Sequence, residues 1–94
     1  MNKYLMEDND VKYKFNEKIS VNYDEDCVVM VNSNTNKIYY GGDIEREILI
    51  KVENGESIQS IINKFNEKYN SDMIDRDVND FILNLVKLGI LVAI

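Results

Sequence analysis

The spacing of apolar residues changes once along the chain, at Gly41-Gly42, and this change restricts the folds open to it. Before the glycines, apolar and polar residues alternate, which predicts β-strands. After them, apolar residues recur every three or four positions, which predicts amphipathic helices. We therefore expect an α+β fold in which an N-terminal three-stranded antiparallel sheet is followed by three helices. The length of 94 residues indicates one domain, at residues 11–94, after a flexible N-terminus at residues 1–10.

Four apolar runs make up the strand half, at residues 11–15, 19–23, 27–31 and 37–40. The run from Cys27 to Val31 is continuous and rich in β-branched residues, as is typical of a central strand. The Asn- and Ser-rich stretch at residues 32–36 predicts a hairpin, because these residues tolerate left-handed turn conformations. Lys37 to Tyr40 is then the returning strand of that hairpin.

Three amphipathic stretches make up the helical half. Asp43, Ser57 and the Asn70–Asp72 stretch are the predicted helix starts, and Gly55 and Gly89 are predicted stops. The apolar stripes expected to face inward are Ile44, Ile48, Leu49 and Val52, then Ile58, Ile61, Ile62, Phe65 and Tyr69, then Ile74, Val78, Phe81, Ile82, Leu85 and Val86. A hairpin beside such a three-helix unit is typical of a winged helix-turn-helix-like domain.

Charge and missing residue types disfavour several classes of function. Asp and Glu number 17 against 11 Lys and Arg, and the net charge of −6 repels nucleic acids and anionic membrane surfaces. The chain has no His, and Cys27 is its one cysteine, so neither a Ser-His or Cys-His pair nor an intramolecular disulfide can form. We expect no catalytic residue, no metal and no cofactor. No signal peptide and no apolar run of about 20 residues is present, so we expect a cytoplasmic protein.

The winged-helix pattern raises the question of DNA binding, and the third helix argues against it. Its outward residues are mostly acidic: Asp72, Asp75, Asp77 and Asp80 against Arg76 and Lys87. A recognition helix needs net positive charge to release counterions from phosphates. A winged-helix transcriptional regulator or antitoxin-like adaptor therefore remains the alternative function. It would depend on a basic patch built from the lysines at 12, 14, 18 and 37.

Several short motifs, taken in order, resemble the PqqD family over residues 19–91. The motifs are Lys37-Ile38-Tyr39-Tyr40-Gly41, Leu49-Ile50 with Val52, Gly55-Glu56-Ser57-Ile58-Gln59-Ser60-Ile61, and Asp77-Val78-Asn79-Asp80-Phe81-Ile82 followed by Leu85 and Gly89-Ile90-Leu91. The chain departs from the family at Ile50, where Trp is common, and at Gly42-Asp43, where Leu-Asn is common.

The resemblance implies a recognition element for ribosomally synthesised, post-translationally modified peptides, a class of natural products that includes bacteriocins and lasso peptides. Members of the family are non-catalytic, with three strands and three helices. They hold the precursor's leader peptide as an added strand against the third strand, beside the third helix, and deliver it to a modifying enzyme. That partner is a radical S-adenosylmethionine enzyme or, for lasso peptides, a leader peptidase with a cyclase. At this length we expect a stand-alone member.

The residues themselves suit such a groove. A strand at the sheet edge offers unpaired backbone groups to another extended chain. On the third helix, four residues of mixed character share a face beside Leu85. The candidate peptide-binding residues are therefore Lys37, Ile38, Tyr39, Tyr40, Asp77, Phe81, Asn84, Leu85 and Leu88.

Several of these candidates also have a purely structural explanation. Phe81 and Leu85 could belong to the core, and Asp77 could serve only the helix dipole. Tyr39 and Tyr40 point to opposite faces of the strand, so one of them is expected to pack inward and the other to contact a ligand. A homodimer formed through the same edge strand would compete for this surface.

Overall fold

A computed structural model describes residues 11–69 and 74–94. Its elements are β1 (Tyr13–Phe15), β2 (Ile19–Tyr23), β3 (Val28–Asn32), β4 (Lys37–Gly41), α2 (Asp43–Glu53), α3 (Ile58–Tyr69), α4 (Ile74–Lys87) and β5 (Leu91–Ala93). The predicted flexible N-terminus and the predicted helix start at Asn70–Asp72 lie outside the described residues. Within the described residues, no helix has the length and apolar character needed to cross a membrane.

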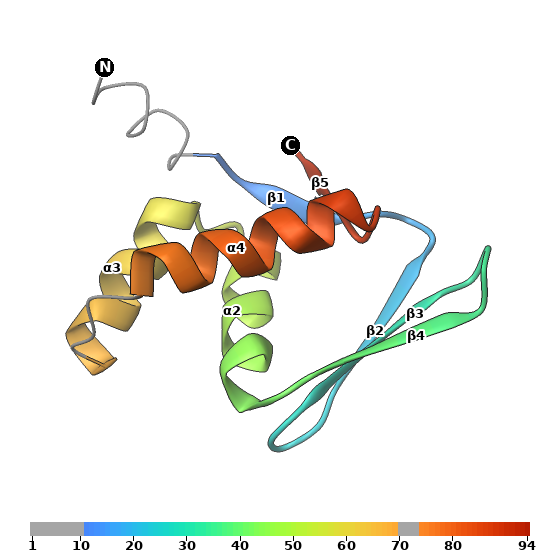
Figure 1. The fold of residues 1–94 in the computed structure, drawn as a ribbon, viewed down its shortest axis with the longest axis horizontal. Helices are drawn as coiled ribbons and strands as arrows, with labels where there is room; N and C mark the ends of the chain where they lie inside the picture. The colour runs from blue at the N-terminus through green and yellow to red at the C-terminus, as the bar shows by residue number, and fades with distance from the viewer. Residues whose placement is uncertain (1–10, 70–73) are drawn as a thin grey trace.

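The predicted three-stranded antiparallel sheet is confirmed, with the order β2-β3-β4. In the β3–β4 hairpin, Tyr39 lies opposite Met30 and Gly41 lies opposite Val28. The turn ends at Asn36, whose φ of 60° is the left-handed conformation that the Asn-rich stretch predicted. Figure 1 shows this sheet extending away from the helices, with β4 leading directly into α2. The side of the sheet that carries Val28 and Met30 is buried in the core.

The predicted strand at residues 11–15 does not belong to this sheet. It forms β1, which pairs with β5 in a separate two-stranded antiparallel sheet, with Tyr13 opposite Ala93. The sequence analysis did not predict β5. Gly89, with φ of 77°, ends α4 as expected, and the chain then buries Ile90 and Leu91 as it returns to β1.

The helix termini use local sequence signals. Ser57 caps α3 as predicted, because its Oγ accepts a hydrogen bond from the Ser60 N–H at 3.2 Å. The prediction for α2 was wrong by one residue, since Gly42 is the N-cap and Asp43 is the first helical residue. Glu45 explains the shift: its carboxylate accepts the Gly42 N–H at 2.8 Å, which satisfies a donor at the helix start without a capping side chain.

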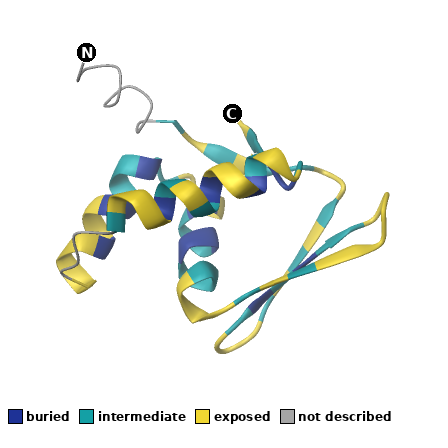
Figure 2. Ribbon diagram, in the orientation of Figure 1, coloured by how far each residue is buried: buried dark blue, intermediate teal, exposed yellow. Residues whose placement is uncertain are grey.

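One core joins the helices to the inner face of the sheet, and Figure 2 shows its buried residues along the facing sides of the helices. The largest fully buried side chains are Phe65, Met30, Leu49, Ile61, Ile62, Ile82, Ile90 and Leu91. Two residues expected inward, Ile44 and Tyr69, are exposed at the ends of their helices. Both line the cavity described below. Three others on α4 are only partly buried against the core: Ile74, Phe81 and Val86.

Two polar contacts hold the sheet against α2. The Tyr23 hydroxyl donates to Glu53 at 2.5 Å, and Arg46 Nε donates to the backbone carbonyl of Asp24. Burial and the Glu53 carboxylate raise the pKa of Tyr23, so its hydroxyl stays protonated and able to donate. The angle between sheet and helices is thereby fixed on the β2 side as well as at the β4–α2 junction.

Candidate functional site

Two backbone hydrogen bonds fix which backbone groups of β3 face β2. At the β2–β3 turn the Asp24 N–H donates to the Cys27 carbonyl, and at the opposite end the Ser33 N–H donates to the Lys18 carbonyl, both at 2.9 Å. Hydrogen-bonded and non-hydrogen-bonded pairs alternate along an antiparallel ladder. The register then makes Val29 and Val31 the residues of β3 that bond to β2. The remaining residues of β3, at 28, 30 and 32, direct their backbone groups toward β4.

The same alternation shows which groups of β4 are free. Lys37, Tyr39 and Gly41 lie opposite residues 32, 30 and 28, so they make the bonds to β3. Ile38 and Tyr40 therefore direct their N–H and C=O groups toward the outer edge. No strand of residues 11–69 or 74–94 pairs with that edge.

The edge ends at Gly42. The Gly42 N–H donates to Glu45, and its carbonyl accepts the Arg46 N–H at 2.9 Å. Ile38 and Tyr40 carry one N–H and one C=O each, so the edge offers two donors and two acceptors to a second extended chain. This is the geometry needed for strand addition.

The side chains of β4 divide as the alternation requires. Tyr39 lies on the inner face opposite Met30 and packs against the core, whereas Tyr40 is 76% exposed and Ile38 52% exposed on the outer face. Of the two tyrosines, Tyr40 is thus the one whose side chain is accessible. Lys37 is exposed at the hairpin end of the strand.

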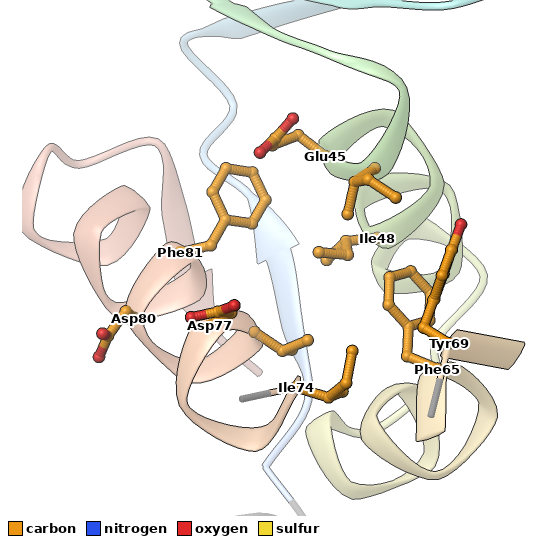
Figure 3. A pocket seen from close by; sticks show the side chains of 10 residues that line it. Glu45, Ile48, Phe65, Tyr69, Ile74, Asp77, Asp80 and Phe81 are labelled. Atoms are coloured by element: carbon orange, nitrogen blue, oxygen red, sulfur yellow. The ribbon is translucent and has the colours of Figure 1, made fainter. Parts of the chain in front are cut away.

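A cavity of about 630 Å³ opens where β4 passes into α2. It lies between α2, the end of α3 and the first half of α4 (Figure 3), and its lining residues are Ile44, Glu45, Ile48, Phe65, Tyr69, Ile74, Asp77, Val78, Asp80 and Phe81. Apolar side chains form most of this wall, which suits an apolar ligand group. Figure 3 shows Glu45 and Asp77 on two sides of the Phe81 ring, with the Asp80 carboxylate directed away from the cavity.

A second hollow of about 500 Å³ continues along the outer side of α4. Its lining residues are Asp80, Phe81, Leu83, Asn84 and Lys87. Phe81 and Asp80 line both the cavity and the second hollow. The cavity and the hollow therefore form one continuous surface along α4, with Phe81 at its centre.

The structure brings some of the predicted site residues together and separates others. Asp77 and Phe81 line the cavity, and Asn84 lines the second hollow. Leu88 is 42% exposed and lines neither. Leu85 is 4% exposed and belongs to the core, so we leave it out of the surface proposed below.

The sequence analysis missed the contribution of α2 to this site. Ile44 and Glu45 line the cavity from the first turn of α2, but only Ile44 had been considered, as a core residue. A signal was available, because a Glu two residues after the helix start at Asp43 is in the position of a capping-box residue. Such a residue lies at the helix end, where a neighbouring cavity can reach it.

The charges around the cavity are unevenly distributed. No Lys or Arg of the described part of the chain lines it, and the Asp77 carboxylate makes no hydrogen bond or ion pair with any described residue. Nearby, Lys68 donates to both oxygens of Glu47 at 3.1 Å, and these bonds raise its pKa. Lys68 is therefore already paired with a carboxylate outside the cavity lining.

The surroundings of Cys27 disfavour its use as a nucleophile. Cys27 precedes β3 in the turn and is half-buried. Partial burial and the carboxylates of Asp24 and Asp26 raise the pKa of its thiol, which disfavours the reactive thiolate. Among the residues that the structure describes, no group of three or more His, Cys, Asp or Glu side chains could hold a metal ion.

A comparison with solved structures supports this architecture. No protein-family model matches the sequence, and no curated protein matches it. Among solved structures, TbiB1 in complex with the TbiA(beta) leader peptide superimposes with a TM-score of 0.77 at 21% sequence identity, covering 83% of this chain and 93% of TbiB1. The chain has the fold of TbiB1. The fold implied by the family resemblance is thus confirmed, and TbiB1 is a protein whose structure contains a bound leader peptide.

Proposed function

We propose that this chain is a non-catalytic protein of the PqqD-like type that binds the leader of a ribosomally synthesised precursor peptide and delivers it to a separate modifying enzyme. The leader pairs as an added strand with the outer edge of β4, beside α4. The free N–H and C=O groups of Ile38 and Tyr40 are the observation on which this proposal chiefly rests. The fold shared with a leader-binding protein supports it.

The chemistry of the β4 edge and of the nearby cavity also favours a peptide ligand. Backbone groups on β4 supply affinity that does not depend on sequence, and the cavity next to them supplies side-chain selectivity. The candidate contacts are Lys37, Ile38, Tyr39 and Tyr40 on β4 and Asp77, Phe81, Asn84 and Leu88 on α4. Tyr39 lies on the inner face of β4, where its half-buried side chain packs against the core.

The alternative as a DNA-binding regulator is weakened by the exposed side of α4. Asp75, Asp77 and Asp80 are all exposed there, beside the exposed Arg76 and Lys87. A duplex approaching this helix would meet net negative charge.

An NMR titration tests the proposal. The ¹⁵N-labelled protein is titrated with the leader of a precursor peptide encoded beside its gene. We expect amide shifts concentrated in β4 and α4, and slower hydrogen exchange of the Ile38 and Tyr40 amides, because a new strand would bond those N–H groups. Shifts on α4 without exchange protection on β4 would exclude strand addition. Shifts with duplex DNA and none with the leader would favour the regulator instead.

A further inference from the structure

The cavity where β4 passes into α2 has a largely apolar wall, and the charged side chains that line it are all negative. We infer that it selects a leader segment carrying an apolar side chain with a Lys or Arg two residues away. This inference rests on the proposed function and adds to it the chemical character of the leader. The apolar side chain enters the cavity between Ile48 and Phe81, and the cation lies at the rim beside Glu45 and Asp77.

The geometry of an added strand explains the spacing of two. The backbone groups of Tyr39 and Gly41 bond to β3. A leader residue paired opposite either of them projects its side chain to the same face of the sheet as the Tyr39 side chain, toward the helices. These two leader residues are two positions apart, about 6.6 to 6.8 Å along a strand. Both therefore project from the face of the sheet that packs against the core, where α2 lies close to Gly41.

Because Gly41 has no side chain, it leaves room for one of these two leader side chains. A side chain there would place a Cβ 2.8 Å from the Glu45 Cβ, which shows how near α2 approaches the strand. The leader residue opposite Gly41 thus projects beside Glu45. One Glu45 oxygen accepts the Gly42 N–H, and a carboxylate has about four acceptor positions, so Glu45 can still accept from a leader cation.

The charges select a cation over an anion. Asp77 has no partner among the described residues, no Lys or Arg of those residues lines the cavity, and Lys68 is paired with Glu47. A Glu in the leader would meet Glu45 and Asp77 with no described cation in the lining to offset them. The net charge of −6 adds a weaker long-range attraction for a basic peptide.

Capped synthetic peptides provide the test. The parent probe is an extended peptide of alternating Thr and Val with a central Leu and a Lys two positions to either side, so that both orders of the motif are present. In matched probes both Lys residues become Gln or Glu, or the central Leu becomes Ser. Affinities are measured by NMR titration at low salt and at about 0.5 M salt, where exposed charges are screened beyond a few ångströms.

We expect the Lys probe to bind about fivefold more tightly than the Gln probe, and the Glu probe to bind more weakly than both. The preference should shrink at high salt, and the Ser probe should lose affinity at either salt concentration. Equal binding of the Lys, Gln and Glu probes, with shifts and exchange protection still at β4, would overturn the inference and leave strand addition standing. The absence of binding by every probe and by the precursor's own leader would remove the proposed function.

Two protein variants separate the cavity rim from the overall charge. Asp77→Asn and Glu67→Gln each remove one negative charge, but Glu67 is an exposed residue of α3 that lines neither hollow. We expect Asp77→Asn to remove most of the preference for Lys over Gln and Glu67→Gln to retain it. Equal losses in the two variants would mean that only net charge attracts the peptide, which would also overturn the inference. The amide spectra of both variants report whether the fold is retained.

Discussion

The alternation of backbone groups along β4 predicts opposite results for proline at adjacent positions. The Tyr40 N–H faces the free edge, whereas the Tyr39 N–H bonds to β3. Proline has no N–H, and it is tolerated on an edge strand where the missing donor would face outward. Tyr40→Pro should therefore leave the protein folded and weaken leader binding, while Tyr39→Pro should destabilise the protein itself.

The expected losses of affinity and stability follow from the number of backbone hydrogen bonds that each variant removes. Two N–H and two C=O groups allow up to four hydrogen bonds to an added strand, each contributing about 0.5–1.5 kcal/mol net. Tyr40→Pro removes one donor, and its ring hinders close approach of the leader, so we expect a loss of about 1–3 kcal/mol. This corresponds to roughly a 5- to 150-fold weaker Kd. Tyr39→Pro removes a ladder bond within the sheet and leaves its carbonyl partner unsatisfied, so it should lower the free energy of unfolding by about 1–3 kcal/mol.

Urea unfolding followed by circular dichroism measures stability, and calorimetric titration with the leader measures affinity. Tyr40→Ala is the matched control, because it removes the same side chain and keeps the N–H. If Tyr40→Pro and Tyr40→Ala bind equally well, the Tyr40 N–H does not contact the leader. If instead Tyr40→Pro unfolds the protein and Tyr39→Pro does not, our assignment of the free backbone groups is wrong.

Three further predictions concern stability, each measured by urea unfolding. Tyr23→Phe should cost about 1 kcal/mol at pH 7 by removing the bond to Glu53. Because folding raises the pKa of Tyr23, this stabilisation is present below the unfolded-chain pKa of about 10 and declines above it, so wild type and variant should converge there; a constant difference would contradict the bond. Gly41→Ala should cost about 1–3 kcal/mol, since its Cβ would lie 2.8 Å from a neighbouring atom, and Gly42→Ala, at 3.3 Å, should cost less. Phe65→Ala should cost about 3–5 kcal/mol, and a cost below about 1 kcal/mol would contradict its place in the core.

Local signals were sufficient to predict most of the fold. The strand β2 follows from alternation and β3 from a continuous β-branched run, while the hairpin to β4 follows from the Asn-rich turn that ends at Asn36. Ser57, Gly55 and Gly89 mark helix ends, and the last two adopt the positive φ that glycine tolerates best. These features depend on neighbours within a few residues, so the sequence carries them directly.

The features that the sequence did not predict depend on distant contacts. The pairing of Tyr13 with Ala93 joins the two ends of the described chain, and no local pattern states which strand a short apolar run will meet. The cavity likewise depends on how α2, α3 and α4 are spaced. Ile44 fits an inward stripe, yet it is 41% exposed because the first turn of α2 borders an opening instead of a packed neighbour.

The sheet has an unpaired edge at each side within the described part of the chain, and these two edges could meet in different copies of the protein. By the same alternation that frees Ile38 and Tyr40 on β4, Val21 and Tyr23 direct their backbone groups outward on β2. Pairing β4 with β4 closes a symmetric dimer, but pairing β4 of one copy with β2 of the next leaves an edge open for a third copy and leads to linear assemblies. A leader bound along β4 would occupy the edge that both arrangements require. Leader binding would then also limit self-association, and sedimentation velocity should show the smallest species when leader and protein are equimolar.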